Sequence, residues 1–200
     1  LAVQRAELFD QLRTKISQLE AAQVELAEKE RMERELELAR QVQQSVLPRT
    51  FPDVPGYTFA ARNVTARQVG GDFYDAFQLE DGRFGVAIAD VSGKGLPAAL
   101  YMALTRILLL AEARRESAPS AVLGKVNDLL QELGQPNMFV TIFYGIVEQA
   151  TGRMTYARAG HDRPLLLRGA AAYEIASPGM ARGLIPTPRI ALADAGLQLQ

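Results

Sequence analysis

Residues 72–90 read DFYDAFQLEDGRFGVAIAD, and this stretch decides the fold around it. Its central residues, Glu80-Asp81-Gly82, are typical of a hairpin loop in which a type I turn is followed by a left-handed glycine. This loop sets the register of the two flanking strands, and it predicts that Asp72 lies directly opposite Asp90. The other predicted pairs are Leu79 with Arg83, Phe77 with Gly85, Asp75 with Ala87 and Phe73 with Ala89.

The side chains on the other face of the predicted hairpin support this register. The large Phe73 and Phe77 lie across from the small Ala89 and Gly85. A two-residue loop would shift the pairing by one residue and place the two aspartates on opposite faces. Directly opposed residues have Cβ atoms ~5 Å apart, so two like charges there repel each other unless a cation lies between them. The alternative is that each aspartate caps a neighbouring glycine-rich turn.

The composition limits the chemistry. The chain has 200 residues, 48% of them hydrophobic, and a formal net charge of −1, which excludes nucleic-acid binding by bulk positive charge. No run approaches the ~20 apolar residues of a membrane helix, and no apolar leader opens the chain, so we expect a cytoplasmic segment without a membrane partner. Because there is no cysteine and only one histidine, His161, any metal is expected to be a hard cation held mainly by oxygen.

The first quarter of the chain differs from the rest. Residues 1–47 contain no glycine or proline and predict one long helix. A short coiled-coil seam runs through Phe9, Leu12, Ile16, Leu19 and Leu26. A dimerising, signal-transmitting helix is the favoured interpretation, and a solvated charged helix is the alternative. Residues 48–55 contain three prolines and predict an extended connector, and residues 56–200 predict a globular unit.

The globular unit is predicted to have an α+β fold with mostly antiparallel pairing, because runs of strands flank a pair of helices. Strands are expected at residues 57–62, 72–79, 84–90, 139–148, 153–159, 165–168, 173–176, 190–192 and 197–200. Helices are expected at residues 97–116 and 120–133. The loop VSGKG before the first of these helices could attract an anion, but Lys94 is followed by Gly95 and not by Ser or Thr, unlike a P-loop.

Two motifs, GGDFYD at residues 70–75 and ADVSGKGLPAA at residues 89–99, carry a family resemblance. They closely resemble the sporulation-type branch of the metal-dependent PP2C-like serine/threonine phosphatases, which act in partner-switching systems that control sigma factors. The resemblance covers residues 40–200 in order, and further matches lie at residues 44–48, 127, 138–141 and 159–161. The N-terminal helix resembles the linker that follows a GAF sensor domain.

The resemblance implies a sandwich of two antiparallel β-sheets flanked by helices, with two Mn²⁺ or Mg²⁺ ions at one edge. Asp72 would bridge the two ions, Asp90 would hold one of them, and the carbonyl of Val91 would add an oxygen ligand. Metal-activated water would then hydrolyse phosphoserine or phosphothreonine on a partner protein. For the partner, the family implies a phosphorylated antagonist of an anti-sigma factor.

Four other residues have open roles. Lys94, Arg62 and Arg67 are candidates for substrate contact, and a solvated loop lysine is the alternative for Lys94. His161 could be a general acid, but a hydrogen-bonded turn after Ala159-Gly160 is the favoured interpretation.

The family pattern continues with further acidic metal ligands where this sequence stops, and Asp162 and Asp194 lack the matching context. We therefore expect either a chain without its C-terminal part or one that has lost catalytic ability. Two hypotheses follow: a phosphatase regulated through its N-terminal helix, and a non-catalytic module that dimerises and binds a partner protein.

Overall fold

The structure is a computed structural model that describes residues 2–65, 68–80, 82–133, 137–175 and 192–199. It divides into two compact units, residues 1–41 and residues 42–200. One helix, α1 (Ala2–Val46), makes up the first unit and ends in the second. The predicted long helix is therefore confirmed. The seam side chains are all exposed in the single chain: Phe9, Leu12, Ile16, Leu19 and Leu26. Their pairing into a coiled coil stays a prediction.

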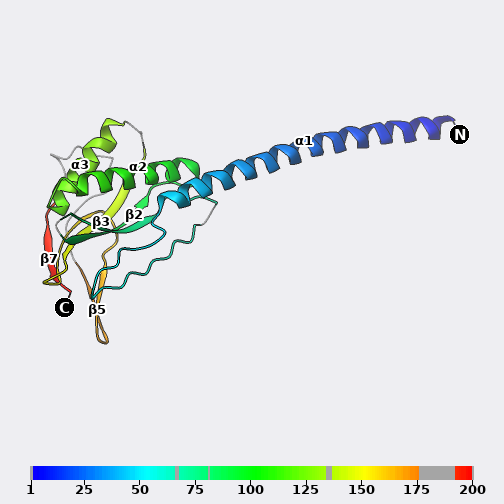
Figure 1. Ribbon diagram of the computed structural model, residues 1–200. Coiled ribbons are helices and arrows are strands. Elements are labelled where there is room, and N and C mark those ends of the chain that lie inside the picture. Colours follow the sequence, from blue (N-terminus) through cyan, green and yellow to red (C-terminus); the bar gives the residue numbers. More distant parts are fainter. Residues whose placement is uncertain (1, 66–67, 81, 134–136, 176–191, 200) are drawn as a thin grey trace. The chain divides into compact units, whose positions relative to one another are not determined.

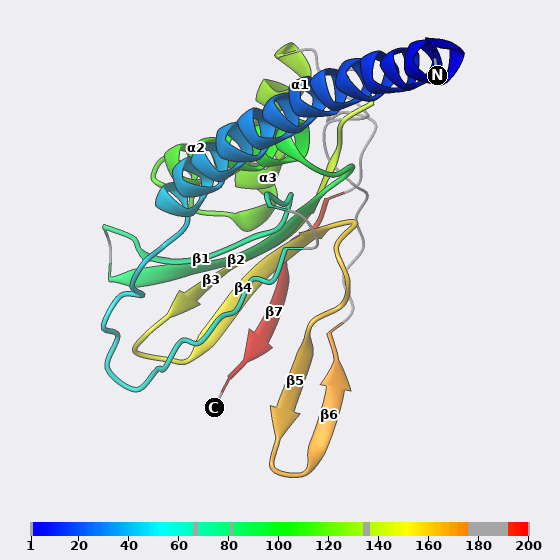
Figure 2. The same cartoon turned by 90° about the vertical axis from the view of Figure 1, so that its right-hand side faces the viewer.

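The second unit is built on an antiparallel sheet in the order β1-β2-β3-β4-β7 (Figure 2). Its strands are β1 (Phe73–Gln78), β2 (Arg83–Val91), β3 (Val140–Glu148), β4 (Arg153–Ala159) and β7 (Ala195–Gln198). A separate hairpin pairs β5 (Leu165–Arg168) with β6 (Ala171–Glu174). Helices α2 (Leu96–Ala113) and α3 (Pro119–Glu132) lie on one side of the large sheet (Figure 1). The α+β prediction with antiparallel pairing is confirmed.

The β1–β2 hairpin has the predicted register. Phe73 pairs with Ala89, and Phe77 pairs with Gly85. The loop closes with a hydrogen bond of 2.9 Å from the amide of Leu79 to the carbonyl of Arg83, and Gly82 has a φ of +79°. A Cβ atom at Gly85 would lie 2.7 Å from the Phe77 ring, so the large-to-small pairing is enforced by packing.

Both faces of the large sheet are covered. The face toward α2 and α3 buries Phe73 and Ile142 against the helices. The opposite face buries Phe84 beneath residues 54–59, where the rings of Tyr57 and Phe59 pack edge-on against it at centroid distances of 4.8 and 5.5 Å. Residues 57–62 were predicted to be a strand, and this was wrong. Their alternating pattern is satisfied by side-chain packing alone, since these residues join no ladder in the described chain.

Several boundaries also differ from the prediction. Strand β6 lies two residues before the predicted 173–176 because a turn at Gly169, with φ +57°, closes the hairpin directly after β5. Strand β7 likewise begins two residues before the predicted 197–200. Helix α2 ends three residues early, where the amides of Arg115 and Glu116 both donate to the carbonyl of Glu112. Of the predicted strand at 190–192, residues 190 and 191 lie outside the described residues, and Leu192 is in no strand.

Helix α2 alone among the described helices is long and apolar enough to cross a membrane by length and composition. Its contacts are those of a core helix, because Met102 and Leu109 are completely buried. Its central Arg106 forms an ion pair with Asp75 of β1, with 2.5 Å between Nη2 and Oδ2. Helix α2 thus supplies the cation that pairs with the Asp75 carboxylate on the inner face of the sheet.

Candidate metal and phosphate site

The two predicted carboxylates lie together at the open end of the hairpin. Asp72 directly precedes β1, and Asp90 is the last residue but one of β2. The pKa of Asp72 is raised to about 6, first by burial, then by a hydrogen bond with the Asp90 carboxyl, and then by the Asp90 charge. Both aspartates line one cavity, so deprotonating both brings two like charges close together.

Two glycines allow the chain to approach this point closely. A Cβ atom at Gly71 would lie 2.7 Å from the carbonyl oxygen of Val91, and one at Gly70 would lie 2.8 Å from Cγ2 of Thr65. A side chain at Gly71 would push the loop away from β2, whereas one at Gly70 would displace the Thr65 side chain. Gly71 therefore lets Asp72 lie next to the backbone that carries Asp90 and Val91.

A cavity of about 310 Å³ opens at this end of the hairpin. Its lining residues are Val64, Thr65, Val69, Gly70, Gly71, Asp72, Asp90, Val91, Ser92, Gly93 and Lys94. The three residues predicted to hold metal, together with Lys94, thus line one cavity. Arg62 is exposed and does not line it, and Arg67 lies outside the described residues.

His161 lies close to Asp90, on the β3 side of β2. Asp90 pairs with Thr141 of β3, and the Thr141 hydroxyl lies 2.9 Å from Nδ1 of His161. Burial lowers the pKa of His161, although the charges of Asp162 and Asp90 oppose the shift. The imidazole is therefore neutral at neutral pH.

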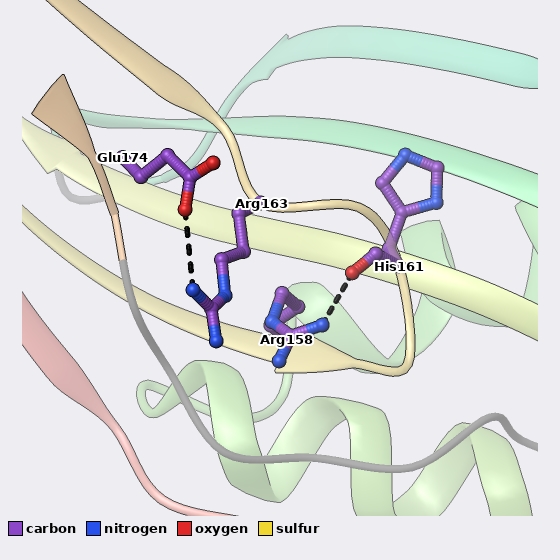
Figure 3. Close-up of polar contacts among 4 residues, drawn as sticks. All are labelled: Arg158, His161, Arg163 and Glu174. Atoms are coloured by element: carbon purple, nitrogen blue, oxygen red, sulfur yellow. Dashed lines mark hydrogen bonds and ion pairs between the residues drawn. The ribbon is translucent and has the colours of Figure 1, made fainter.

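The turn that carries His161 is tied to its surroundings. Figure 3 shows the Arg158 guanidinium donating to the carbonyl of His161. The same view shows Arg163 paired with Glu174 of β6 at 3.1 Å. The hydrogen-bonded turn favoured by the sequence is present, and His161 is not among the residues lining the cavity.

Three contacts around the site were missed by the sequence analysis. The side-chain Nδ2 of Asn63 donates to the backbone carbonyl of Asp72 at 2.9 Å, and the Gln43 side chain hydrogen-bonds to the backbone of Gly70. Nothing in the local pattern pointed to either contact. The third is the Asp75 ion pair, for which a signal existed: Asp75 shares the inward face of β1 with two phenylalanines, and a buried carboxylate there needs a cationic partner.

The donor set fits a hard cation. Two carboxylates and the Val91 carbonyl are the oxygen ligands that Mg²⁺ and Mn²⁺ prefer. Within the described ranges, no group of three or more Asp, Glu or His residues forms a cluster that could hold a metal ion. Asp194 instead accepts a hydrogen bond of 2.7 Å from the amide of Ser120, in the first turn of α3. The described residues therefore offer two carboxylates and one carbonyl to a cation, which is fewer than a complete set of ligands.

Comparison with known families identifies the class. The family described as Stage II sporulation protein E (SpoIIE) matches residues 80–199, which is more than half of the chain. The chain belongs to this family, and its fold is PP2C-like.

Individual relatives agree with that class. Protein IcfG of Synechocystis sp. is 32% identical over 180 residues, which cover 76% of this chain and 28% of that protein. Phosphoserine phosphatase RsbU of Bacillus subtilis is 35% identical over 128 residues, which cover 64% of this chain and 38% of RsbU. The chain thus spans between 28% and 38% of the length of these curated relatives. The SiaA-PP2C domain of Pseudomonas aeruginosa shares the fold, with a TM-score of 0.68 and 19% identity over 86% of this chain and 69% of that one.

Proposed function

We propose that this protein is a metal-dependent phosphatase that hydrolyses phosphoserine or phosphothreonine on a partner protein. The observation that carries the proposal is that the hairpin register brings Asp72, Asp90 and Val91 to one cavity, which Lys94 also lines. Membership of the SpoIIE family and the similarity to RsbU support it. By the same resemblance, the substrate class is a phosphorylated antagonist of an anti-sigma factor in the cytoplasm.

Each residue of the site has a distinct role in this proposal. Asp72, Asp90 and the Val91 carbonyl hold Mn²⁺ or Mg²⁺, and the resemblance implies two ions in the complete site. A bound cation supplies Lewis acidity, which lowers the pKa of water and neutralises charge on the phosphoryl group. The positive charge of Lys94 draws the phosphorylated side chain toward the cavity. A protein nucleophile is not required, in keeping with a chain that has no cysteine.

Regulation through α1 is the second part of the proposal. The exposed seam from Phe9 to Leu26 would pair with a second copy of the chain and so form a homodimer. An upstream sensor domain would then act through this helix on the phosphatase domain. The exposure of five regularly spaced apolar side chains supports this part, since burying them needs a second apolar surface.

The test is hydrolysis of a phosphoserine peptide and of p-nitrophenyl phosphate, with and without Mn²⁺. It uses the 200-residue chain and the longest natural form of the protein. We expect Mn²⁺-dependent turnover that falls at least ~100-fold in Asp72→Asn, because a lost metal ligand removes several kcal/mol of charge stabilisation. Asp53→Asn, at an exposed position of the connector, is the matched control. A lack of Mn²⁺-dependent turnover in the longest form would overturn the proposal.

A second candidate is a non-catalytic module that dimerises and binds a partner protein. It is favoured by the absence of a third acidic or histidine ligand beside Asp72 and Asp90 among the described residues. This candidate predicts partner binding that is independent of Mn²⁺ and unaffected by Asp72→Asn. The same experiment, with partner binding as a second readout, separates the two functions.

A further inference from the structure

Gln43 is a buried amide in the last turn of α1. The residue is 8% exposed, whereas the neighbouring Gln41 and Gln44 are exposed. Gln43 and the site loop belong to the same compact unit, residues 42–200. A buried amide needs hydrogen-bond partners, because an unpaired one costs free energy in an apolar environment.

Both partners of Gln43 are on a single residue of the site loop. Its Nε2 donates to the carbonyl oxygen of Gly70, and its Oε1 accepts from the amide of Gly70 at 3.3 Å. One side chain thus satisfies both backbone polar groups of Gly70, as a neighbouring strand would. Without Gln43, a partly buried amide and carbonyl would lose these partners.

Gly70 lies two residues before Asp72, so its backbone determines where the Asp72 carboxylate can lie. The loop is held at three points: Gln43 binds Gly70, Gly71 packs on the Val91 carbonyl, and Asn63 binds the Asp72 carbonyl. The contacts of Gly71 and Asn63 come from the globular part of the chain. The Gln43 contact alone among these three comes from the last turn of α1.

We propose that Gln43 is a positioning residue for Asp72. By fixing Gly70 it sets the distance between the two carboxylates, and it links the last turn of α1 to the affinity of the site for a divalent cation. The inference rests on the proposed function in one respect, namely that the site binds such a cation. The link is reciprocal: a change in α1 that withdraws Gln43 weakens cation binding, and a bound cation favours the docked turn.

The experiment compares Gln43→Met, which keeps the length of the side chain without its hydrogen bonds, with Gln44→Met on the adjacent exposed position. Amide hydrogen exchange at Gly70 is measured by NMR without metal. Mn²⁺ affinity is measured from paramagnetic broadening of the Gly71 and Val91 amide signals. We expect Gln43→Met to speed exchange about tenfold and to weaken Mn²⁺ binding about tenfold, as loss of a supporting contact to a ligand does.

The outcomes separate this inference from the proposed function. Gln44→Met should change both quantities less than about twofold. If the wild type binds Mn²⁺ and Gln43→Met binds it equally well, the positioning role is overturned and the proposed function is not. If Mn²⁺ broadens no signals in the wild type, both proposals are overturned. A purely structural role would lower the melting temperature but not the Mn²⁺ affinity. If Gln43→Met does not fold, Gln43→Glu keeps an acceptor for the Gly70 amide and lacks the donor, and it should weaken Mn²⁺ binding in the same direction.

Discussion

Asp72 and Asp75 lie three residues apart in the same motif, yet the structure gives them opposite partners. Asp75 points into the core, where its side chain is 2% exposed and faces Arg106 at 2.5 Å. Asp72 stands at the cavity and faces a second carboxyl group, that of Asp90. Burial raises the pKa of both aspartates, but Arg106 opposes the shift at Asp75 whereas Asp90 adds to it at Asp72.

The difference separates a structural carboxylate from one that is available to a ligand. At Asp75 the protein supplies its own cation, so the pair is complete within the fold. At Asp72 the nearest ionisable partner is another acid, and the folded protein carries a repulsion that an external cation would relieve. The like-charged pair is therefore where we propose that a cation binds, and the oppositely charged pair joins α2 to the sheet.

The largest expected effect on stability comes from breaking the ion pair between Asp75 and Arg106. Arg106→Met leaves the Asp75 carboxylate buried without its partner and should lower the free energy of unfolding by about 3–5 kcal/mol. Urea denaturation measures the change. The double variant Asp75→Leu with Arg106→Met should recover most of the loss, because it removes the buried charge as well.

A matched control uses an exposed arginine just beyond the end of α2. Arg115 is paired with Glu112 at 3.8 Å and is 77% exposed. Arg115→Met should cost less than about 1 kcal/mol. Equal losses in the two arginine variants would show that the Asp75 pair is no anchor.

The next effect comes from completing the like-charged pair with a cation. Adding Mn²⁺ to one hundred times its dissociation constant should raise the free energy of unfolding at pH 7.5 by about 2.7 kcal/mol. Thermal melting followed by circular dichroism measures the shift. Asp72→Asn should remove most of it, and an equal shift in that variant would place the metal elsewhere.

A smaller effect concerns the metal-free protein and its pH dependence. Since the folded-state pKa of Asp72 is about 6 and its ordinary value is 3.8, the folded state binds this proton more tightly than the unfolded state. This carboxyl therefore destabilises the fold above pH 6 and ceases to do so as the pH falls toward 4. Asp72→Asn should raise the melting temperature at pH 7.5 by about 3 °C, from about 1 kcal/mol of relieved repulsion.

The pH profile provides the control for that prediction. The gain of Asp72→Asn should shrink as the pH falls from 6 toward 4 and vanish at about pH 3, where the wild-type carboxyl is protonated in the folded and unfolded states. A gain that is constant from pH 4 to pH 8 would mean that the substitution acts through packing and not through charge.

The smallest effect tests whether the Asp75–Arg106 and Asp72–Asp90 pairs form in the unit of residues 42–200 without the rest of α1. Removing residues 1–41 should change the free energy of unfolding of this unit by less than about 0.5 kcal/mol, because the unit retains its core and Gln43. If the seam forms the proposed dimer, light scattering should show that the shortened chain is a monomer, because the deletion removes the seam. Removing residues 1–48 also removes Gln43, and it should weaken Mn²⁺ binding relative to the shorter deletion.

The hairpin could be predicted because its determinants are neighbours in the chain. Loop length, Gly82 and the alternation of large and small residues together specify one register, and the structure has it. The strand expected at residues 57–62 failed for the opposite reason. Its alternation correctly indicated that Tyr57 and Phe59 face the sheet, but a strand also requires a partner backbone, which alternation alone does not reveal.

The sequence by itself determined that Asp72 and Asp90 meet, because turn geometry and strand periodicity act over a few residues. Only the tertiary structure decided which groups surround them. Gln43 reaches Gly70 across 27 residues of chain, and Thr141 reaches His161 across 20. Contacts over such separations depend on how helices and strands pack, and packing is settled by the shape of the whole core and not by any local pattern.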